Sequence, residues 1–308
     1  RFCNNIKFNK ISSIKLNLSD PHRKGKTVTK VDLDNGYSVI YKPRNLKKEI
    51  LLNKIYQIFM ENSTFQFIIL NVVDRQTYGW EEYIESKECN IEDDVKKYFE
   101  RMGYLLFICY LLGATDIHCE NIIASGEFPV LIDLETIPGV VLKKVPYTVE
   151  EYVNIKISNS VMRTGILPTM TWGQNGEGVI VSALGKCTNK KSPFNLPYIK
   201  NAFSSDIHIA YAKKEISVKC SLPIFQGNLV DATYYCDLVC SGFEKAYCLY
   251  VNLQTKMKDI IKNLLEQKGR VIFRHTQQYS MYLNISFYPQ FLKSWEERYQ
   301  FFSALNEH

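Results

Sequence analysis

A short segment in the middle of the chain limits most strongly what this sequence can fold into. Residues 121–124 have the pattern of a strand, residues 125–127 include a glycine that suits a turn, and residues 129–132 have the pattern of a returning strand. This pattern predicts a β-hairpin that brings Asp133 back beside Asn121. Because amide and carboxylate oxygens are ligands that magnesium prefers, the hairpin predicts a magnesium site at its base. A buried polar turn between strands is the alternative interpretation.

Asp116 precedes Asn121 by five residues, which is the spacing found in a kinase catalytic loop. In such a loop the aspartate takes the proton of the hydroxyl that is phosphorylated, and the asparagine ligates the metal. The segment Asp133-Leu134-Glu135 stands where a protein kinase has Asp-Phe-Gly, whose aspartate also ligates magnesium. The spacing therefore predicts phosphoryl transfer that uses ATP and Mg²⁺.

The first part of the chain has the pattern of a small antiparallel sheet. Residues 26–32 and 37–41 alternate β-branched or aromatic residues with polar ones, on either side of an Asp-Asn-Gly turn at 34–36. The second strand leads to Lys42, where kinases place the lysine that pairs with the phosphates of ATP. An ordinary edge-strand lysine is the alternative interpretation. Residues 45–61 show the apolar spacing of a helix that packs on the sheet.

Helices are expected in much of the remaining chain. Acidic residues at 92–94 open a predicted helix that runs to a stop at Gly113. Its second half is apolar on every face, as in the central helix of a large lobe. Residues 232–267 predict two long helices. The expected fold class is α+β, with the two-lobed arrangement of protein and lipid kinases: a small antiparallel β lobe and a larger helical lobe.

Composition narrows the functional classes. The net charge of +6 is diffuse, with no five-residue basic run, so nucleic-acid binding is not expected. The nine cysteines are odd in number and form no Cys-x-x-Cys pair, which predicts a reducing, cytoplasmic setting. Cys236 and Cys240 have no histidine pair nearby, so zinc is not expected. The longest apolar run, 104–112, is too short to cross a bilayer, and no membrane span is expected.

Six motifs occur in order along the chain. They are Asp20-Pro21-His22 with Gly25-Lys26-Thr27-Val28, then Tyr41-Lys42-Pro43-Arg44, residues 78–84, residues 115–121, residues 132–136, and the set Arg270, Arg274, Thr276 and Tyr279. In this order and spacing they resemble the dehydratase domain of class II lanthipeptide synthetases, the LanM type. The resemblance covers about residues 20–301, and it departs from the family pattern at Ser19, where the family usually has glycine.

The resemblance implies a bifunctional enzyme on a kinase-like fold with family-specific insertions. Such an enzyme uses ATP and Mg²⁺ to phosphorylate Ser and Thr of a precursor peptide, and then eliminates phosphate to leave dehydroalanine or dehydrobutyrine. By position, the residues expected to serve phosphorylation are Lys42, Asp116, His118, Asn121 and Asp133, with Glu135 among the nucleotide-binding residues. The residues expected to serve elimination are Asp20, His22, Arg270 and Thr276, with Lys42 shared between the steps.

The chemistry of the second set agrees with that division. A guanidinium such as that of Arg270 binds phosphate through two parallel hydrogen bonds, and Thr276 adds a hydroxyl six residues later. Thr276 is also a candidate N-cap for a helix that begins near Gln277. We accordingly expect three regions: 1–85, a β-rich lobe with the ATP-contacting lysine; 86–137, the catalytic and metal-binding loops; and 138–308, a helical lobe with activation-type loops and the elimination motif.

The resemblance also implies partners. The substrate is expected to be a precursor peptide with a leader and a core rich in Ser, Thr and Cys. A cyclase is expected on the same or a separate polypeptide, because the Cys-His-Gly and Trp-Cys motifs of a zinc cyclase are absent from this sequence, and the start at Arg1 predicts a fragment of a longer protein. Two alternatives remain: a kinase-like phosphotransferase without elimination, and an inactive kinase-like module that binds leader peptide.

Overall fold

The structure is a computed structural model that describes residues 7–19, 25–139, 147–172, 178–186, 190–191, 195–213, 215–216, 220–271 and 276–306. Contacts divide the chain into two compact units. Unit 1 comprises Arg1–Pro168, Ser182–Lys186 and Lys219–Arg270. Unit 2 comprises Thr169–Val181, Cys187–Val218 and Val271–His308.

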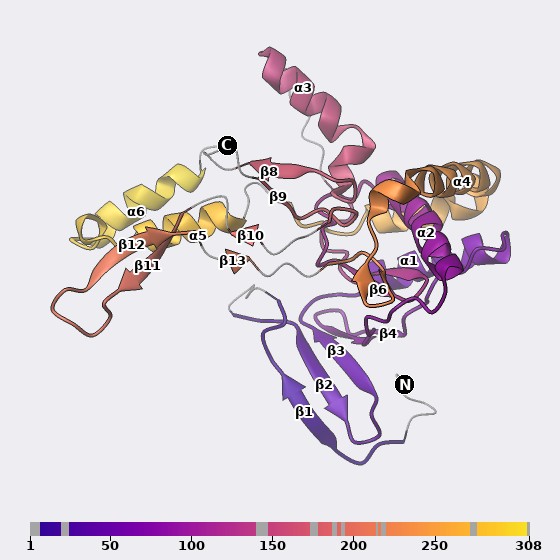
Figure 1. The fold of residues 1–308 in the computed structure, drawn as a ribbon, viewed down its shortest axis with the longest axis horizontal. Helices are drawn as coiled ribbons and strands as arrows, with labels where there is room; N and C mark the ends of the chain where they lie inside the picture. Colours follow the sequence, from indigo (N-terminus) through magenta and orange to yellow (C-terminus); the bar gives the residue numbers. More distant parts are fainter. Residues whose placement is uncertain are drawn as a thin grey trace. The chain divides into compact units, whose positions relative to one another are not determined.

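Unit 1 begins with a five-stranded antiparallel sheet in the order β1-β2-β3-β5-β4 (Figure 1). Its strands are β1 (Ile11–Lys15), β2 (Thr29–Leu33), β3 (Ser38–Lys42), β4 (Val72–Asp74) and β5 (Gly79–Glu82). The turn between β2 and β3 has Gly36 at a φ of 81°, a conformation that glycine adopts without steric cost. The hairpin predicted from the Asp-Asn-Gly turn is therefore confirmed, and it places Lys42 at the end of a central strand.

Three long helices form the core of unit 1 together with the strands. They are α1 (Lys47–Glu61), α2 (Glu92–Leu111) and α4 (Cys236–Leu265), and a shorter helix, α3 (Val149–Ser158), has no buried residue. The Asp94 carboxylate accepts hydrogen bonds from the backbone N–H groups of Asn90 and Ile91, at 2.9 and 3.2 Å, so the acidic residues do open α2. The helix ends before Gly113, whose φ is 68°, as predicted.

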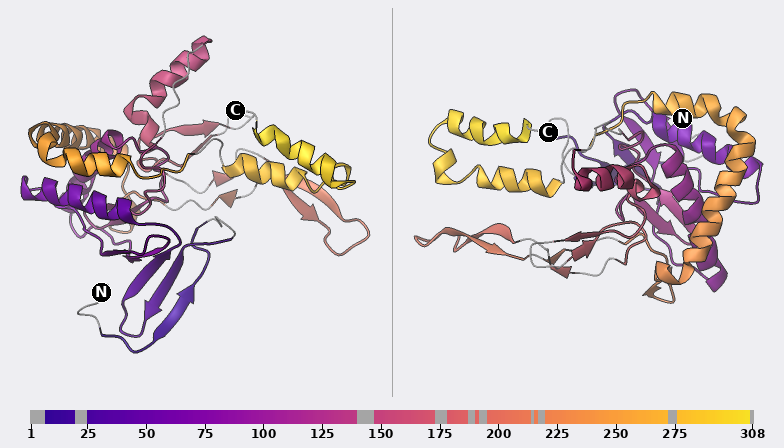
Figure 2. Two further views of the ribbon diagram at one scale, coloured as in Figure 1. Left: turned by 180° about the vertical axis from the view of Figure 1, so that it is seen from behind. Right: turned by 90° about the horizontal axis from the view of Figure 1, so that it is seen from above.

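Helices α2 and α4 cross at unusually close range (Figure 2). A Cβ atom at Gly103 of α2 would lie 2.1 Å from the Val239 carbonyl oxygen, and one at Gly242 of α4 would lie 2.0 Å from the Glu100 carbonyl oxygen. Both positions therefore require glycine. The expectation of two long helices over 232–267 is wrong, because α4 is one continuous helix preceded only by the 3₁₀ helix η2 (Ala232–Tyr235).

Short hairpins complete unit 1. Strands β6 (Ile122–Ser125) and β7 (Phe128–Leu131) pair directly after the predicted catalytic loop, and β14 (Ile224–Phe225) pairs with β15 (Asn228–Leu229). The buried Arg101 of α2 donates hydrogen bonds to the backbone carbonyls of Gln66 and Glu127, each at 2.9 Å. These bonds tie the turn of the β6–β7 hairpin to the central helix.

Unit 2 consists of short strand pairs and two helices. Its strands are β8 (Met170–Trp172), β9 (Gly178–Ile180), β10 (Lys190–Lys191), β11 (Leu196–Lys200), β12 (His208–Ala212) and β13 (Glu215–Ile216), paired as β8–β9, β10–β13 and β11–β12. Helices α5 (Thr276–Ile285) and α6 (Trp295–Ser303) lie side by side in Figures 1 and 2, and the rings of Tyr282 and Phe301 stand 5.2 Å apart between them.

The chain is thus a mixed α+β protein with a small antiparallel sheet and several helices, which confirms the broad fold class. Within the described part of the chain, no helix is both long enough and apolar enough to cross a membrane.

Candidate functional site

The β6–β7 hairpin places Asn121 and Asp133 at its base. Ile122 pairs with Leu131 at the open end of the hairpin, and the backbone N–H of Ile132 donates to the Asn121 carbonyl at 2.9 Å. Asp133 follows Ile132 directly, so the backbone brings it beside Asn121. The structure therefore confirms the predicted hairpin, with each strand shifted by one residue toward the turn.

The loop before the hairpin is held by its own backbone. Asp116 has a φ of 58°, a left-handed conformation that costs energy for a residue other than glycine. The next residue, Ile117, donates its N–H to the Thr164 carbonyl at 2.7 Å. The Asn121 side-chain amide donates to the Asp116 carbonyl at 2.9 Å. These bonds fix the loop in a shape that leaves the Asp116 side chain exposed.

His118 lies in the same loop, between these two residues. Its Nδ1 accepts a hydrogen bond from the backbone N–H of Glu120 at 3.2 Å. A neutral imidazole whose Nδ1 is an acceptor carries its proton on Nε2. The loop therefore sets the tautomer of His118 as well as the orientation of the Asn121 amide.

Lys42 is buried and connects the sheet to the hairpin. Its ammonium forms an ion pair with Glu81 on the neighbouring strand β5 and donates to the Ile132 carbonyl at 2.7 Å. Burial raises the pKa of the Glu81 carboxyl, although the adjacent lysine opposes that change. Because β3 is a central strand and Lys42 is only 6% exposed, the edge-strand interpretation is wrong.

The guanidinium of Arg44 contacts three carboxylates. Its Nη2 lies 2.7 Å from Glu49 Oε1 and 3.3 Å from Asp133 Oδ1, and its Nε lies 3.2 Å from Glu135 Oε1. Burial would lower the pKa of Arg44, but these carboxylates raise it above its usual range, so the guanidinium stays charged. Asp133, the predicted metal ligand, therefore forms an ion pair with Arg44, a residue that was not predicted to belong to the site.

Arg270 approaches the same group of residues from the far end of unit 1. Its backbone N–H donates to the Glu135 carbonyl at 2.7 Å, and its Nη1 lies 3.4 Å from Glu135 Oε2. Glu135 consequently contacts two guanidiniums, those of Arg44 and Arg270. Arg270, which is expected to serve elimination, thus contacts a residue that stands two positions after the predicted metal ligand, Asp133.

A fourth cation, Lys48, holds the backbone of the same loop. This buried lysine in the first turn of α1 donates to the backbone carbonyls of Leu134, Glu135 and Ile137, at 2.7, 3.0 and 2.7 Å. Burial, followed by the charge of Arg44, lowers the pKa of the Lys48 amine to about 8.

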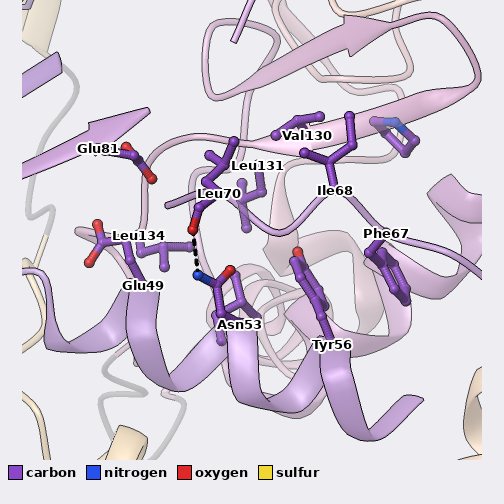
Figure 3. A pocket seen from close by; sticks show the side chains of 12 residues that line it. Glu49, Asn53, Tyr56, Phe67, Ile68, Leu70, Glu81, Val130, Leu131 and Leu134 are labelled. Atoms are coloured by element: carbon purple, nitrogen blue, oxygen red, sulfur yellow. Dashed lines mark hydrogen bonds between the residues drawn. The ribbon is translucent and has the colours of Figure 1, made fainter. Parts of the chain in front are cut away.

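A narrow pocket adjoins this cluster (Figure 3). Figure 3 shows the carboxylates of Glu49 and Glu81 at one end and the rings of Tyr56 and Phe67 at the other. The remaining lining residues, apart from Asn53, are apolar: Leu52, Ile68, Leu70, Pro129, Val130, Leu131 and Leu134. The polar end is continuous with the Lys42–Glu81 ion pair, while the apolar end is part of the core between α1 and β7.

Asp133 and Asn121 offer oxygen atoms of the kind that Mg²⁺ binds. Among them no group of three or more His, Cys, Asp and Glu side chains could hold a metal ion. Magnesium characteristically takes one or two carboxylates and completes its shell with water and substrate phosphates. Asp133 with the amide oxygen of Asn121 fits that kind of site.

Some of the predicted site residues are not among the residues that the structure describes. Asp20 and His22 lie outside the described residues, as do Arg274 and the side chain of Thr276, which begins α5. For these positions the assigned roles stay predictions.

Four residues of this site were not predicted from the sequence: Arg44, Lys48, Glu49 and Glu81. Arg44 stands in the Tyr-Lys-Pro-Arg motif and Glu81 within residues 78–84, so both were inside quoted motifs without being selected. Lys48 and Glu49 had no motif of their own. Both residues are charged and yet buried in α1. Their burial could be recognised as a sign of a functional role only after the apolar face of α1 was known.

Comparison with known proteins defines the class. Residues 1–308 match the model of the family described as a domain of unknown function (DUF4135), and the chain belongs to that family. This is the family of the LanM dehydratase region, so the resemblance inferred from the six motifs is confirmed.

A curated relative is the lacticin 481/lactococcin biosynthesis protein LcnDR2 of Lactococcus lactis subsp. lactis. The chain is 30% identical to it in an alignment 321 positions long, which covers 96% of this chain and 33% of the relative. The chain thus spans about a third of the length of that protein.

Proposed function

We propose that this chain catalyses the dehydration of Ser and Thr in a precursor peptide during lanthipeptide biosynthesis. The reaction proceeds by phosphorylation with ATP and Mg²⁺ and then by elimination of phosphate. One observation carries the proposal: Lys42 and Arg270 both contact the loop that contains Asp133, Lys42 through the Ile132 carbonyl and Arg270 through Glu135. A lysine, a metal-binding carboxylate and a phosphate-binding arginine are what the two steps require.

A kinase-like two-lobed fold accounts for this arrangement. The sheet ends in a buried lysine on β3, a helix follows that strand, and the hairpin with Asn121 and Asp133 follows the central helix α2. We infer the small β lobe from the five-stranded sheet and the larger lobe from α2 and α4. The relative's role in lacticin 481 biosynthesis supports the same functional class.

In the first step Asp116 accepts the proton of the substrate hydroxyl as its oxygen attacks the γ-phosphorus. The bond from that phosphorus to the β-phosphate oxygen breaks, and ADP is released. When bound, Mg²⁺ neutralises charge on the phosphates. Lys42 contributes a fixed positive charge beside them, and Asn121 and Asp133 would hold the metal.

In the second step Asp20 or His22 accepts the α-proton of the phosphorylated residue. Its electron pair forms the Cα–Cβ double bond, and the Cβ–O bond breaks to release phosphate. Arg270 binds the departing phosphate, whose negative charge grows in the transition state. Asp20, His22 and Thr276 complete this step in the proposal.

The alternative of a phosphotransferase without elimination differs at one point. It gives no role to Arg270, whereas the structure places the Arg270 guanidinium 3.4 Å from Glu135 and thus close to Asp133. Conversion of authentic phosphopeptide to dehydrated peptide in the absence of ATP turnover separates the two functions.

The first step is tested with Asp133→Asn, which keeps the size of the side chain but removes its charge. We expect precursor phosphorylation to fall on the order of 10²-fold or more, because the metal loses its carboxylate ligand. Mass spectrometry of the precursor measures the product. Asp93→Asn, a change in an exposed ion pair with Lys97, is the matched control and should leave the rate unchanged. Undiminished phosphorylation by the Asp133 variant would remove Asp133 from the site.

A further inference from the structure

The loop that carries Asp133 and Glu135 has no regular secondary structure of its own. Strand β7 ends at Leu131, and the next backbone groups must find other partners because buried carbonyls are costly to leave unpaired. Lys42 takes the Ile132 carbonyl, and Lys48 takes the carbonyls of Leu134, Glu135 and Ile137. The ammonium groups of two lysines thus provide the hydrogen bonds that a neighbouring strand would provide in a sheet.

Lys48 is fully engaged in this task. An ammonium group has three N–H donors, and each of the three carbonyls lies within 3.0 Å of it. The side chain is only 7% exposed, and the loop carbonyls occupy all three of its donors. Lys48 therefore has no donor left for a phosphate, and its hydrogen bonds serve to hold the loop.

The same loop positions both sets of reacting groups. Asp133 accepts the N–H of Glu135 through Oδ1 at 2.9 Å, which orients its carboxylate within the loop. The Glu135 carbonyl accepts from Lys48 and also from the backbone N–H of Arg270, at 3.0 and 2.7 Å. A shift of this peptide would move Asp133 and the attachment of Arg270 together.

We propose that Lys48 is a positioning residue for both steps of the reaction, acting through the carbonyls of the 133–137 loop. The inference rests on the proposed function for its catalytic consequence. Helix α1 acts as the rigid support, because Leu51, Leu52 and Ile55 bury its apolar face. The loop keeps its place relative to the hairpin because Lys48 ties it to that helix.

The test uses Lys48→Met, which preserves the length of the side chain and removes all three donors. We expect the apparent Mg²⁺ affinity or the kcat for phosphorylation to fall about 10–100-fold, the usual effect of losing a residue that orients a metal ligand. The KM for precursor peptide should stay unchanged. Elimination from synthetic phosphopeptide should also slow, because Arg270 is attached to the same loop.

Arg101→Met is the matched control. It also removes a buried cation that bonds two backbone carbonyls, but at the turn of the hairpin, away from the metal-binding end. Both variants should lower the melting temperature, whereas only Lys48→Met should change the Mg²⁺ dependence. If the two variants have the same Mg²⁺ dependence and kcat as the unchanged protein, Lys48 is only structural and the proposal is overturned.

Amide hydrogen exchange tests the positioning role without relying on activity. Lys48→Met should increase exchange within residues 132–139, and Arg101→Met should not. Faster exchange with no phosphorylation even by the unchanged protein would support the positioning role and contradict the proposed function. If Lys48→Met does not fold, Lys48→Gln, which keeps two N–H donors, replaces it. Unaltered exchange over 132–139 in a folded variant overturns the proposal.

Discussion

Glu81 supplies the negative charge that stabilises the buried ammonium of Lys42. The two side chains are 5% and 7% exposed, and the other acceptor near the ammonium is the Ile132 carbonyl. Glu81→Gln would leave a buried cation without its counter-charge. We expect the free energy of unfolding to fall by ~3–5 kcal/mol, as for other buried pairs that lose one partner. Urea denaturation measures this loss.

Two further variants check the cause. Lys42→Met in the Glu81→Gln background should recover part of the stability, since it removes the uncompensated charge. Glu92→Gln breaks an exposed pair with Lys96 and should change stability by less than about 0.5 kcal/mol. Equal effects of Glu81→Gln and Glu92→Gln would mean that the buried pair contributes no more than a surface pair.

At the scale of single residues, the sequence allowed us to predict those site residues whose role follows from their place next to a strand or turn. Lys42 could be selected because it ends a strand, and Asn121 and Asp133 because a turn brings them together. Arg44 and Lys48 could not, because their importance comes from contacts with residues about 90 positions away, at 133–137. No local pattern encodes that pairing.

At the scale of elements, helices α2 and α4 cross at positions where only glycine leaves enough space. Gly242→Ala would place a Cβ atom 2.0 Å from the Glu100 carbonyl oxygen, which is backbone and can yield only if the helices separate. We expect a loss of ~1–3 kcal/mol in unfolding free energy, the usual result of overpacking, despite the better helix propensity of alanine. Thermal or urea unfolding measures it.

Gln254→Ala is the matched control, because Gln254 is exposed on the same helix. It should be neutral or slightly stabilising. If Gly242→Ala stabilises the protein by as much as Gln254→Ala, the helices do not approach each other as closely as described.

Elements with local signals were predicted well. Acidic residues and Gly113 marked the two ends of α2, and the turns at 34–36 and 125–127 marked both hairpins. Helix α4 was divided wrongly into two, because the sequence showed where helix is favoured but not that Gly242 serves a crossing within one continuous helix. That role depends on α2, which is more than a hundred residues earlier.

At the scale of the whole molecule, the proposed two-step reaction uses residues from the first and last parts of unit 1. Arg270 follows α4, yet its backbone and side chain both contact Glu135. The sequence placed Arg270 in a separate elimination motif and gave no indication that it lies beside the metal-binding loop. The contact with Glu135 provides a physical reason for one chain to carry both steps.

Arg270→Ala tests this account most directly. The change removes a phosphate-binding guanidinium but leaves Lys42, Asn121, Asp133 and the pairing of Glu135 with Arg44 intact. We expect elimination to slow by two to three orders of magnitude, from a loss of ~3–4 kcal/mol in transition-state stabilisation. Phosphoryl transfer should continue.

The decisive measurement is mass spectrometry of the precursor peptide after incubation with ATP and Mg²⁺. The unchanged protein should yield dehydrated peptide, and the Arg270→Ala variant should accumulate peptide that retains phosphate. Unmodified peptide from a folded Arg270→Ala variant would contradict the account, because it would assign Arg270 to the use of ATP and not to elimination.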